Sequence, residues 1–383
     1  MILIEHIDID NIVKEYADEL ISLFEAKRKP ILHICSLLKK DSSITKEDVN
    51  GVKKHLQALK LVLGKENLQK PKKQIYGRDT DTLIYNLNKY RIHYDKRSKC
   101  RKNKRVEEVL KQIQIIFGTV KLHDLFTSEP SKLKELNSHF AKKFIEPQLY
   151  LHFFDHEKYY SFLNSNISQK LDLRCCPYCN RNFISYVHTI NNKKVIGPTY
   201  DHFFLKKEFK FLTLSFYNLI PSCYVCNSNL KHQIPFDLST HQHPYVEQFG
   251  EDAKFDFDIS NSKGKIVFTP QIKLKLGLKQ SSALKISGDL KNSNDLTSGN
   301  IRVFKLQEIY ATHSDTVEEV HTKFDKNSPF YVQSIKDSLK ALKVSEEEFY
   351  RFHFNNYFNP GDFHRRPLAK LTKDIYEKMK DLQ

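Results

Sequence analysis

The sequence has no long apolar run, no nucleotide-binding P-loop, no internal repeat and no low-complexity tract. A membrane-spanning helix needs roughly 18 or more apolar residues in a row, so we expect no contact with a membrane. Because the pattern G-x-x-x-x-G-K-[ST] is missing, any ATP hydrolysis linked to this protein must occur in another chain. The first residues, MILIEHIDIDNIVKEY, lack the basic start and apolar core of a signal peptide, and we expect a cytoplasmic protein.

Acidic residues are too few to balance the basic ones. The 383 residues include 62 Lys and Arg against 46 Asp and Glu, which gives a net charge of +16. Such an excess favours a polyanionic partner, and nucleic acid is the usual one. A basic surface that is simply solvated is the alternative.

The N-terminal region, residues 1–150, has the pattern of successive amphipathic helices. The segment NIVKEYADELISLFEA places apolar residues on one side of a helix, namely Ile12, Tyr16, Leu20 and Leu23. In the next helix, Thr45 is the expected N-cap and Gly64 the expected stop. Residues 89–105 carry nine Lys or Arg and one acid. Contacts with phosphates need such charges, and an exposed basic loop is the alternative. The candidate contacts are Arg97, Arg101, Lys102 and Arg105.

The C-terminal region, residues 250–383, begins with strands and continues with helices. KFDFDIS and GKIVFTPQIKLKL alternate in polarity and are separated by NSKG, which predicts a hairpin. Further on, Ser345 followed by three glutamates is expected to cap a helix. The chain is therefore predicted to have an α+β fold that is mostly helical, with a small C-terminal β element.

Four of the seven cysteines form two C-x-x-C pairs, Cys176 with Cys179 and Cys223 with Cys226. Each such turn can present two thiolates to one ion, and two turns complete a tetrahedral site. Four thiolates leave no open position, so we expect one structural zinc ion per chain. The remaining thiols, Cys35, Cys100 and Cys175, are expected to be free.

The stretch between the two pairs carries polar residues in a definite order. Asp201 and His202 end a short β-like run, Asn218 precedes a second one in NLIPS, and CYVCNSNLKHQ opens a helix. Asn227 and Lys231 lie four apart and so on one face of that helix.

This stretch, within residues 170–245, resembles an HNH endonuclease core, the ββα-metal fold, in its zinc-knuckle form. The resemblance implies a central zinc-bound core that hydrolyses phosphodiester bonds. It implies that His202 is the general base and that Asp201 and Asn227 bind a divalent cation. Asn218 would orient His202 or brace the loop, and Lys231 and Lys206 would reach phosphates.

Two departures from the common family pattern affect these expectations. The helix residue is Asn227 where many members have histidine, which favours Mg²⁺ or Mn²⁺ over Zn²⁺ or Ni²⁺ at the catalytic site. The usual proline or glycine after the Asp-His pair is missing from DHFFLKK. Downstream, His241 and His243 either bind a metal or belong to a turn followed by packing of Tyr245 and Phe249.

The arrangement of the flanking regions also resembles the HNH subunits of bacterial anti-phage systems such as Septu and some retrons. That resemblance implies a partner, an ABC-type ATPase encoded beside the nuclease. DNA is the favoured substrate, and RNA such as tRNA is the alternative on the same fold. A zinc-stabilised adaptor without catalysis is the remaining alternative.

Overall fold

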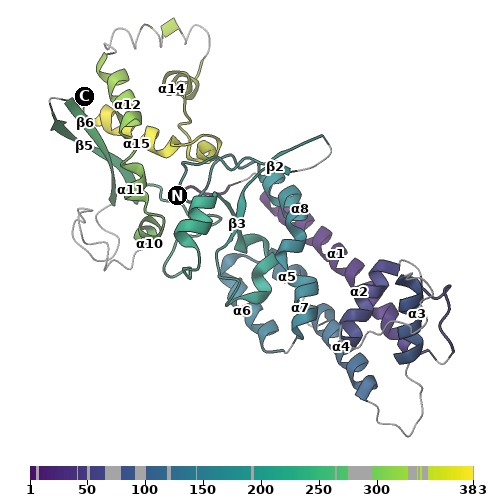
Figure 1. The fold of residues 1–383 in the computed structure, drawn as a ribbon. Helices are drawn as coiled ribbons and strands as arrows, with labels where there is room; N and C mark the ends of the chain where they lie inside the picture. The colour runs from purple at the N-terminus through teal and green to yellow at the C-terminus, as the bar shows by residue number, and fades with distance from the viewer. Residues whose placement is uncertain are drawn as a thin grey trace. The chain divides into compact units, whose positions relative to one another are not determined.

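The computed structural model is mostly helical and contains small antiparallel sheets, as the sequence predicts (Figure 1). In the part of the chain that the structure describes, no helix combines the length and the apolar character needed to span a bilayer. The described residues are 1–5, 8–40, 42–49, 52–64, 79–90, 101–118, 122–143, 145–190, 194–263, 265–274, 296–326, 334, 337–338 and 344–382.

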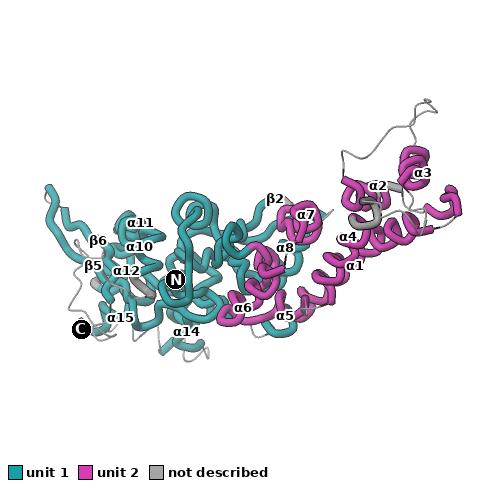
Figure 2. The backbone as a smooth tube through the Cα atoms, turned by 90° about the horizontal axis from the view of Figure 1, so that it is seen from below, with its two compact units in different colours: residues 1–12, 160–209, 217–383 teal, residues 13–159, 210–216 magenta. Residues whose placement is uncertain are grey.

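Contacts divide the chain into two compact units, coloured separately in Figure 2. The helical unit comprises residues 13–159 and 210–216, and the mixed unit comprises residues 1–12, 160–209 and 217–383. Apart from residues 210–216, the predicted regions 170–245 and 250–383 thus fall in the same unit. One reason is Asn300, whose side chain bonds both the amide and the carbonyl of Gln242 at 2.9 and 3.1 Å.

The helical unit follows the predicted periodicity with one correction. Along its first helix the buried stripe runs through Tyr16, Leu20 and Phe24, whereas Leu23 is 40% exposed. The stripe continues at steps of four residues. Four residues make slightly more than one 3.6-residue turn, so the fourth side chain returns to nearly the same face of the helix. The helices and turns of this unit are α1 (Ile9–Leu38, which begins in the mixed unit), α2 (Val52–Leu63), α3 (Asp79–Tyr90), α4 (Arg101–Gly118), α5 (Leu122–Thr127), α6 (Pro130–Ala141), α7 (Pro147–Phe154), η2 (His156–Tyr159) and η4 (Lys210–Leu214).

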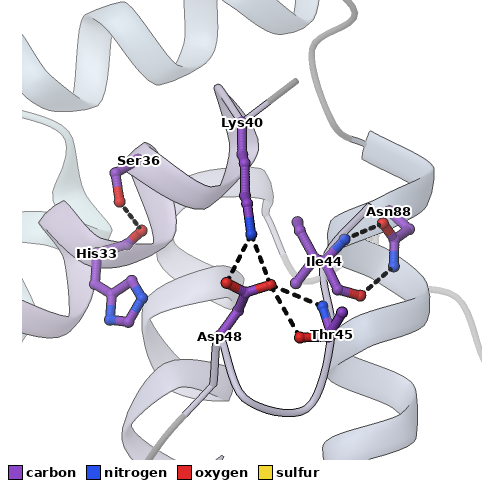
Figure 3. A network of polar contacts seen from close by, with 7 residues as sticks. All are labelled: His33, Ser36, Lys40, Ile44, Thr45, Asp48 and Asn88. Carbon is purple, nitrogen blue, oxygen red and sulfur yellow. Dashed lines mark hydrogen bonds and ion pairs between the residues drawn. The ribbon is translucent and has the colours of Figure 1, made fainter. Parts of the chain in front are cut away.

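Thr45 does not cap a helix, because α2 begins only at Val52. Asp48, three residues further on, accepts the backbone N–H of Thr45 at 2.8 Å and pairs with Lys40 at 2.7 Å (Figure 3). This local bond closes a turn where the sequence predicted the first turn of a helix. Short acidic side chains often bond nearby backbone groups in this way and so compete with helix formation. The predicted stop at Gly64 is confirmed: its φ of +83° is left-handed.

Asn88 of α3 fixes the segment before that turn. Its side chain accepts the N–H of Ile44 at 2.9 Å and donates to the carbonyl of Ile44 at 3.0 Å (Figure 3). One amide thereby satisfies both backbone groups of a buried residue, as a neighbouring strand would.

The segment 210–216 belongs to the helical unit although it lies, in sequence, between two strands of the mixed unit. Phe211 stacks on Phe140 with ring centroids 5.3 Å apart, and Ser215 donates to the carbonyl of Leu125 at 2.6 Å. The hydroxyl of Tyr16 donates to the carbonyl of Leu214 at 2.8 Å. The segment is therefore an integral part of this helical core.

Within its described residues the mixed unit contains three sheets, each a two-stranded antiparallel pair: β1 with β2, β3 with β4 and β5 with β6. The predicted hairpin is present, with β5 and β6 paired along ten residues each. The predicted cap is also confirmed, since Ser345 and Glu348 form a reciprocal capping box. The elements are α8 (Tyr160–Leu163), η3 (Asn164–Ser168), α9 (Gln169–Leu171), β1 (Val187–His188), β2 (Lys194–Ile196), β3 (Thr199–His202), η5 (Phe216–Asn218, shared with the helical unit), β4 (Leu219–Ser222), η6 (Val225–Lys231), β5 (Ala253–Ser262), β6 (Lys265–Leu274), α10 (Leu296–Val303), α11 (Leu306–Tyr310), α12 (Ser314–Lys326), α14 (Glu346–Phe354), η7 (Pro360–Arg365) and α15 (Ala369–Asp381).

Replacing Asn88 tests the clamp on Ile44. We expect Asn88→Ala to lower the free energy of unfolding by about 1–3 kcal/mol, because it removes two hydrogen bonds to backbone groups. Urea unfolding measures the change. Ser36→Ala is the control, since that exposed hydroxyl bonds the carbonyl of His33 within its own helix. Equal stability of the two variants would contradict the interpretation.

Candidate functional site

The four predicted cysteines come together in the mixed unit. The sulfur atoms of Cys176, Cys179, Cys223 and Cys226 all lie within 4.8 Å of one another, and all four residues are buried. Zinc–sulfur bonds of about 2.3 Å in a tetrahedron place the sulfur atoms about 3.8 Å apart. The cluster thus fits a metal ion such as zinc after only slight contraction.

Backbone and amide groups support the thiolates. The N–H of Cys226 and the side-chain amide of Asn182 donate to the sulfur of Cys223 at 3.4 and 3.2 Å. Hydrogen bonds from the other three cysteines and then from Asn182 hold the pKa of the Cys223 thiol far below its usual range. The thiolate is the form that binds metal, and Cys223 is held in that form. Burial raises the pKa of Cys176, and hydrogen bonds from the other three cysteines raise that of Cys226, so these two thiols keep their protons until a metal displaces them.

Cys175 and Cys35 are free and buried, as predicted. Burial raises the pKa of each thiol to about 12, so both stay protonated at neutral pH. Cys175 forms an isolated β-bridge with Phe183. Its backbone has a structural role, and its sulfur is not part of the cluster. Cys100 lies outside the described residues.

Adjacent cysteines offer a matched test of the cluster. We expect Cys176→Ser to lose the metal and to unfold the mixed unit locally, because three thiolates and one hydroxyl bind zinc more weakly. Cys175→Ser should retain one metal ion per chain. Elemental analysis and limited proteolysis measure both. A Cys176→Ser protein with full metal content and unchanged proteolysis would contradict the assignment.

Asn180 lies directly after the first cysteine pair. It joins the turn that carries this pair, which we call the first knuckle (residues 174–180), to the C-terminal segment. Its φ of +46° is left-handed, a conformation that asparagine tolerates better than most residues. Its side chain donates to the carbonyl of Phe363 at 2.7 Å and accepts the N–H of Lys370 at 3.2 Å, while its carbonyl accepts the N–H of Leu368 at 2.6 Å. Asn180 is not among the predicted site residues. An asparagine just past a C-x-x-C turn was the available signal.

The strands β3 and β4 present the predicted Asp-His pair. β3 ends with Asp201 and His202, which lie opposite Ile220 and Leu219 of β4. Asn218, next to β4, accepts the N–H of Phe204 at 2.7 Å and donates to its carbonyl at 3.2 Å. Its main-chain carbonyl accepts the N–H of Phe203 at 3.0 Å. Asn218 therefore fixes the backbone just after His202.

Asp201 is buried in a network that the sequence analysis did not foresee. Its Oδ1 pairs with the Nζ of Lys231 at 2.9 Å, and its Oδ2 accepts the hydroxyl of Tyr178 at 2.7 Å. The side chain of Lys231 is 0% exposed and that of Asp201 is 3% exposed. Burial and then the Asp201 charge raise the pKa of Tyr178 well above its usual value, so its hydroxyl remains a donor.

The remaining bonds of Lys231 link η6, the helix that carries it, to β3. Its Nζ also donates to the carbonyl of His202 at 2.8 Å and lies 4.8 Å from the ring centroid of Phe236. The structure therefore does not place Lys231 where it could contact a phosphate, as the resemblance had implied. Its ammonium is enclosed and directed at Asp201, which positions the Asp-His pair.

The buried pair can be tested by stability. We expect Lys231→Met to lower the free energy of unfolding by about 3–5 kcal/mol, because it leaves a buried carboxylate without its counterion. Lys206→Met, at an exposed lysine of the same chain segment, should change stability little. Denaturant unfolding measures both.

A second substitution, at Asp201, checks that the loss of stability comes from this ion pair. Asp201→Asn with Lys231→Met should be less destabilised than the sum of the two single variants, because neither buried charge remains. Strict additivity of the two substitutions would contradict a direct interaction between the side chains.

The other predicted residues are placed as follows. Asn227 is half-buried at the start of η6, which is a π-helix, and its N–H donates to the carbonyl of Cys223 at 3.0 Å. Lys206 is exposed after β3. Arg97 lies outside the described residues, and Arg101 and Lys102 begin α4 with side chains that are not described.

Arg105 is engaged within the helical unit. It pairs with Glu146, and its Nε donates to the carbonyl of Val62 at 3.2 Å. These bonds join α4 to the end of α2 and to the residue before α7. Its contact with nucleic acid stays a prediction.

His241 and His243 take part in packing. The ring of His241 stacks on Phe236 with centroids 3.8 Å apart, and His243 lies 4.2 Å from Phe203. Burial lowers the pKa of His241 to about 4 and that of His243 to about 3, so both are neutral at pH 7. Tyr245 packs on Tyr217 at 5.3 Å, as the packing alternative expects. Among the described residues, the four cysteines are the one cluster of three or more Cys, His, Asp or Glu able to hold a metal ion.

Comparison of the chain with protein-family models, with curated proteins and with solved structures finds no match.

Proposed function

We propose that this protein is an HNH-type endonuclease that hydrolyses phosphodiester bonds of nucleic acid at the Asp201–His202 pair. One observation carries the proposal. The strand that ends with Asp201 and His202, the strand β4 that follows Asn218, and the helix bearing Asn227 and Lys231 are joined to a four-cysteine cluster at both ends. That order of elements is what an HNH core in its zinc form requires.

His202 is the proposed general base. It lies at the end of β3 and is 8% exposed, so only a small part of its side chain reaches the surface. A neutral imidazole can take the proton of the water that attacks the phosphorus. Asn218 acts indirectly, because it fixes the backbone of Phe203 and Phe204, which follow His202. The ammonium of Lys231 also holds the carbonyl of His202.

A divalent cation, Mg²⁺ or Mn²⁺, is the proposed catalytic cofactor. Asp201 and Asn227 would hold it, and this oxygen-only donor set suits those ions. Each oxygen of Asp201 already accepts one hydrogen bond but has a second lone pair. The ion would share the carboxylate with Lys231. When bound, it stabilises the charge that develops on the phosphate and the leaving oxygen.

DNA is the favoured substrate because the expected relatives act in anti-phage defence, and an ABC-type ATPase is the proposed partner of this cytoplasmic effector. RNA remains the alternative substrate, because a ββα-metal site holds the phosphodiester and does not read the sugar. An adaptor that binds nucleic acid without cleaving it is the second alternative. It leaves the order of Asp201, His202 and Asn218 without a reason.

The His202→Ala variant tests the proposal. We expect the natural chain with Mg²⁺ or Mn²⁺ to cut labelled DNA, and His202→Ala to lose at least about a hundredfold in rate, the usual effect of removing a general base. His139→Ala, at an exposed histidine of α6, is the control. Total RNA in a parallel reaction distinguishes the two substrates. Undiminished cutting by His202→Ala would exclude this role.

A further inference from the structure

A polar pocket of about 780 Å³ lies in the mixed unit, on the side of the first knuckle that faces the C-terminal segment. Its walls come from the start of the knuckle, from the residues around β1 and from the end of η7. We call it the arginine–aromatic pocket. The residues used below are Arg174, Phe183, Tyr186, His188, Arg365 and Arg366.

The charge of the pocket is positive. Three arginines and a single acid, Asp172, contribute to its lining. Arg174 pairs with Asp172 at 3.5 Å, and Arg365 pairs with Asp362 at 3.0 Å, but the two arginine side chains remain 52% and 49% exposed. Exposed pairs of this kind are weak. A phosphate can therefore replace the carboxylate partners, and guanidinium groups bind phosphate through two parallel hydrogen bonds.

The aromatic side chains of the pocket have flat faces at the surface. Phe183 is 65% exposed, so one face of its ring is open to a ligand. Tyr186 and His188 form a second aromatic surface, with ring centroids 5.4 Å apart and an interplanar angle of 23°. Nucleobases bind proteins by stacking on faces of this type.

The pocket is held in shape by the metal knuckle. The N–H groups of Arg174 and Cys175 both donate to the carbonyl of His364, at 3.2 and 2.8 Å. Asn180 bonds the carbonyls of Phe363 and Arg366 at 2.7 and 3.3 Å. Phe183 is placed by the β-bridge with Cys175. The walls from the knuckle and from η7 are thus fixed by hydrogen bonds, and little order has to be created there on binding.

We propose that the arginine–aromatic pocket binds an unpaired nucleotide of a single-stranded nucleic acid segment, with the base on Phe183 and the phosphate on Arg174, Arg365 and Arg366. Stacked and paired bases of a duplex do not present the faces that this pocket needs. The inference rests on the proposed function, because it makes single-stranded regions the preferred substrate class of the nuclease.

Binding can be measured apart from cleavage. The full chain carrying His202→Ala is mixed with a short labelled single-stranded oligonucleotide, without Mg²⁺ or Mn²⁺, and fluorescence anisotropy is recorded. DNA and RNA strands are tested separately, and a matching duplex and a nucleoside monophosphate serve as competitors. The added variants are Phe183→Ala and Arg365→Ala. The controls are Phe352→Ala, at a phenylalanine of α14 that is 78% exposed, and Lys265→Ala, at an exposed cation of β6.

We expect Phe183→Ala to weaken strand binding about tenfold, as loss of one stacking face does. Arg365→Ala should weaken it several-fold and reduce the salt dependence by about one phosphate contact. Both controls should bind as the parent does, and the duplex should compete poorly.

Three results would overturn the proposal. The first is equal binding by the Phe183→Ala and Phe352→Ala proteins. The second is a duplex that competes as well as the single strand. The third is a nucleoside monophosphate that competes as well as the single strand at equal concentration, which would make the pocket a site for a free nucleotide. Strand binding without any cleavage by the natural chain would instead sustain the pocket and remove the proposed function.

Discussion

The closure of four sulfur atoms into one cluster is the constraint on which the rest of the mixed unit depends. From the first knuckle, Tyr178 reaches Asp201 and Asn180 reaches the C-terminal segment. From the second, η6 carries Lys231 back to the same carboxylate. Each hydrogen bond alone contributes about 1 kcal/mol, whereas structural zinc contributes on the order of 10 kcal/mol in small domains. A zinc ion in the cluster would therefore contribute more to the order of the site than any one of these bonds.

The pair of Asp201 and Lys231 is better understood as a device for position than for stability. Burying two charges costs several kcal/mol per ion, and their attraction offsets this only when the geometry is good. Here the ammonium bonds both a side chain and the carbonyl of the next residue. The orientation of β3 against η6 is thereby fixed at the residue where the proposed chemistry occurs. A divalent cation at Asp201 would meet a positive charge already in place, which would make the affinity of the site for metal depend on Lys231.

Local signals in the sequence were sufficient where the structure is local. The cysteine spacing predicted the cluster, alternation predicted the β5–β6 hairpin, and Ser345 with Glu348 predicted a cap. Prediction failed where two local bonds compete, as at Thr45, where Asp48 closes a turn. It also failed where the partner is remote. Lys231 has the pattern of a solvated lysine until Asp201, thirty positions earlier, is brought beside it, and Asn180 bonds residues more than 180 positions away. The proposed roles of Asp201, His202 and Asn227 came from resemblance and stay predictions.

The segment 210–216 links the two units in a way that sequence order hides. Its apolar side chains Phe211, Leu212, Leu214 and Phe216 are buried in the core of the helical unit, although the strands on either side belong to the mixed unit. A fragment that begins at Tyr160 would keep these four side chains, lose the core that covers them and also lack residues 1–12 of its own unit. Exposed apolar patches of that kind promote aggregation. The mixed unit therefore cannot be obtained by simple truncation; the loop must also be shortened or made polar.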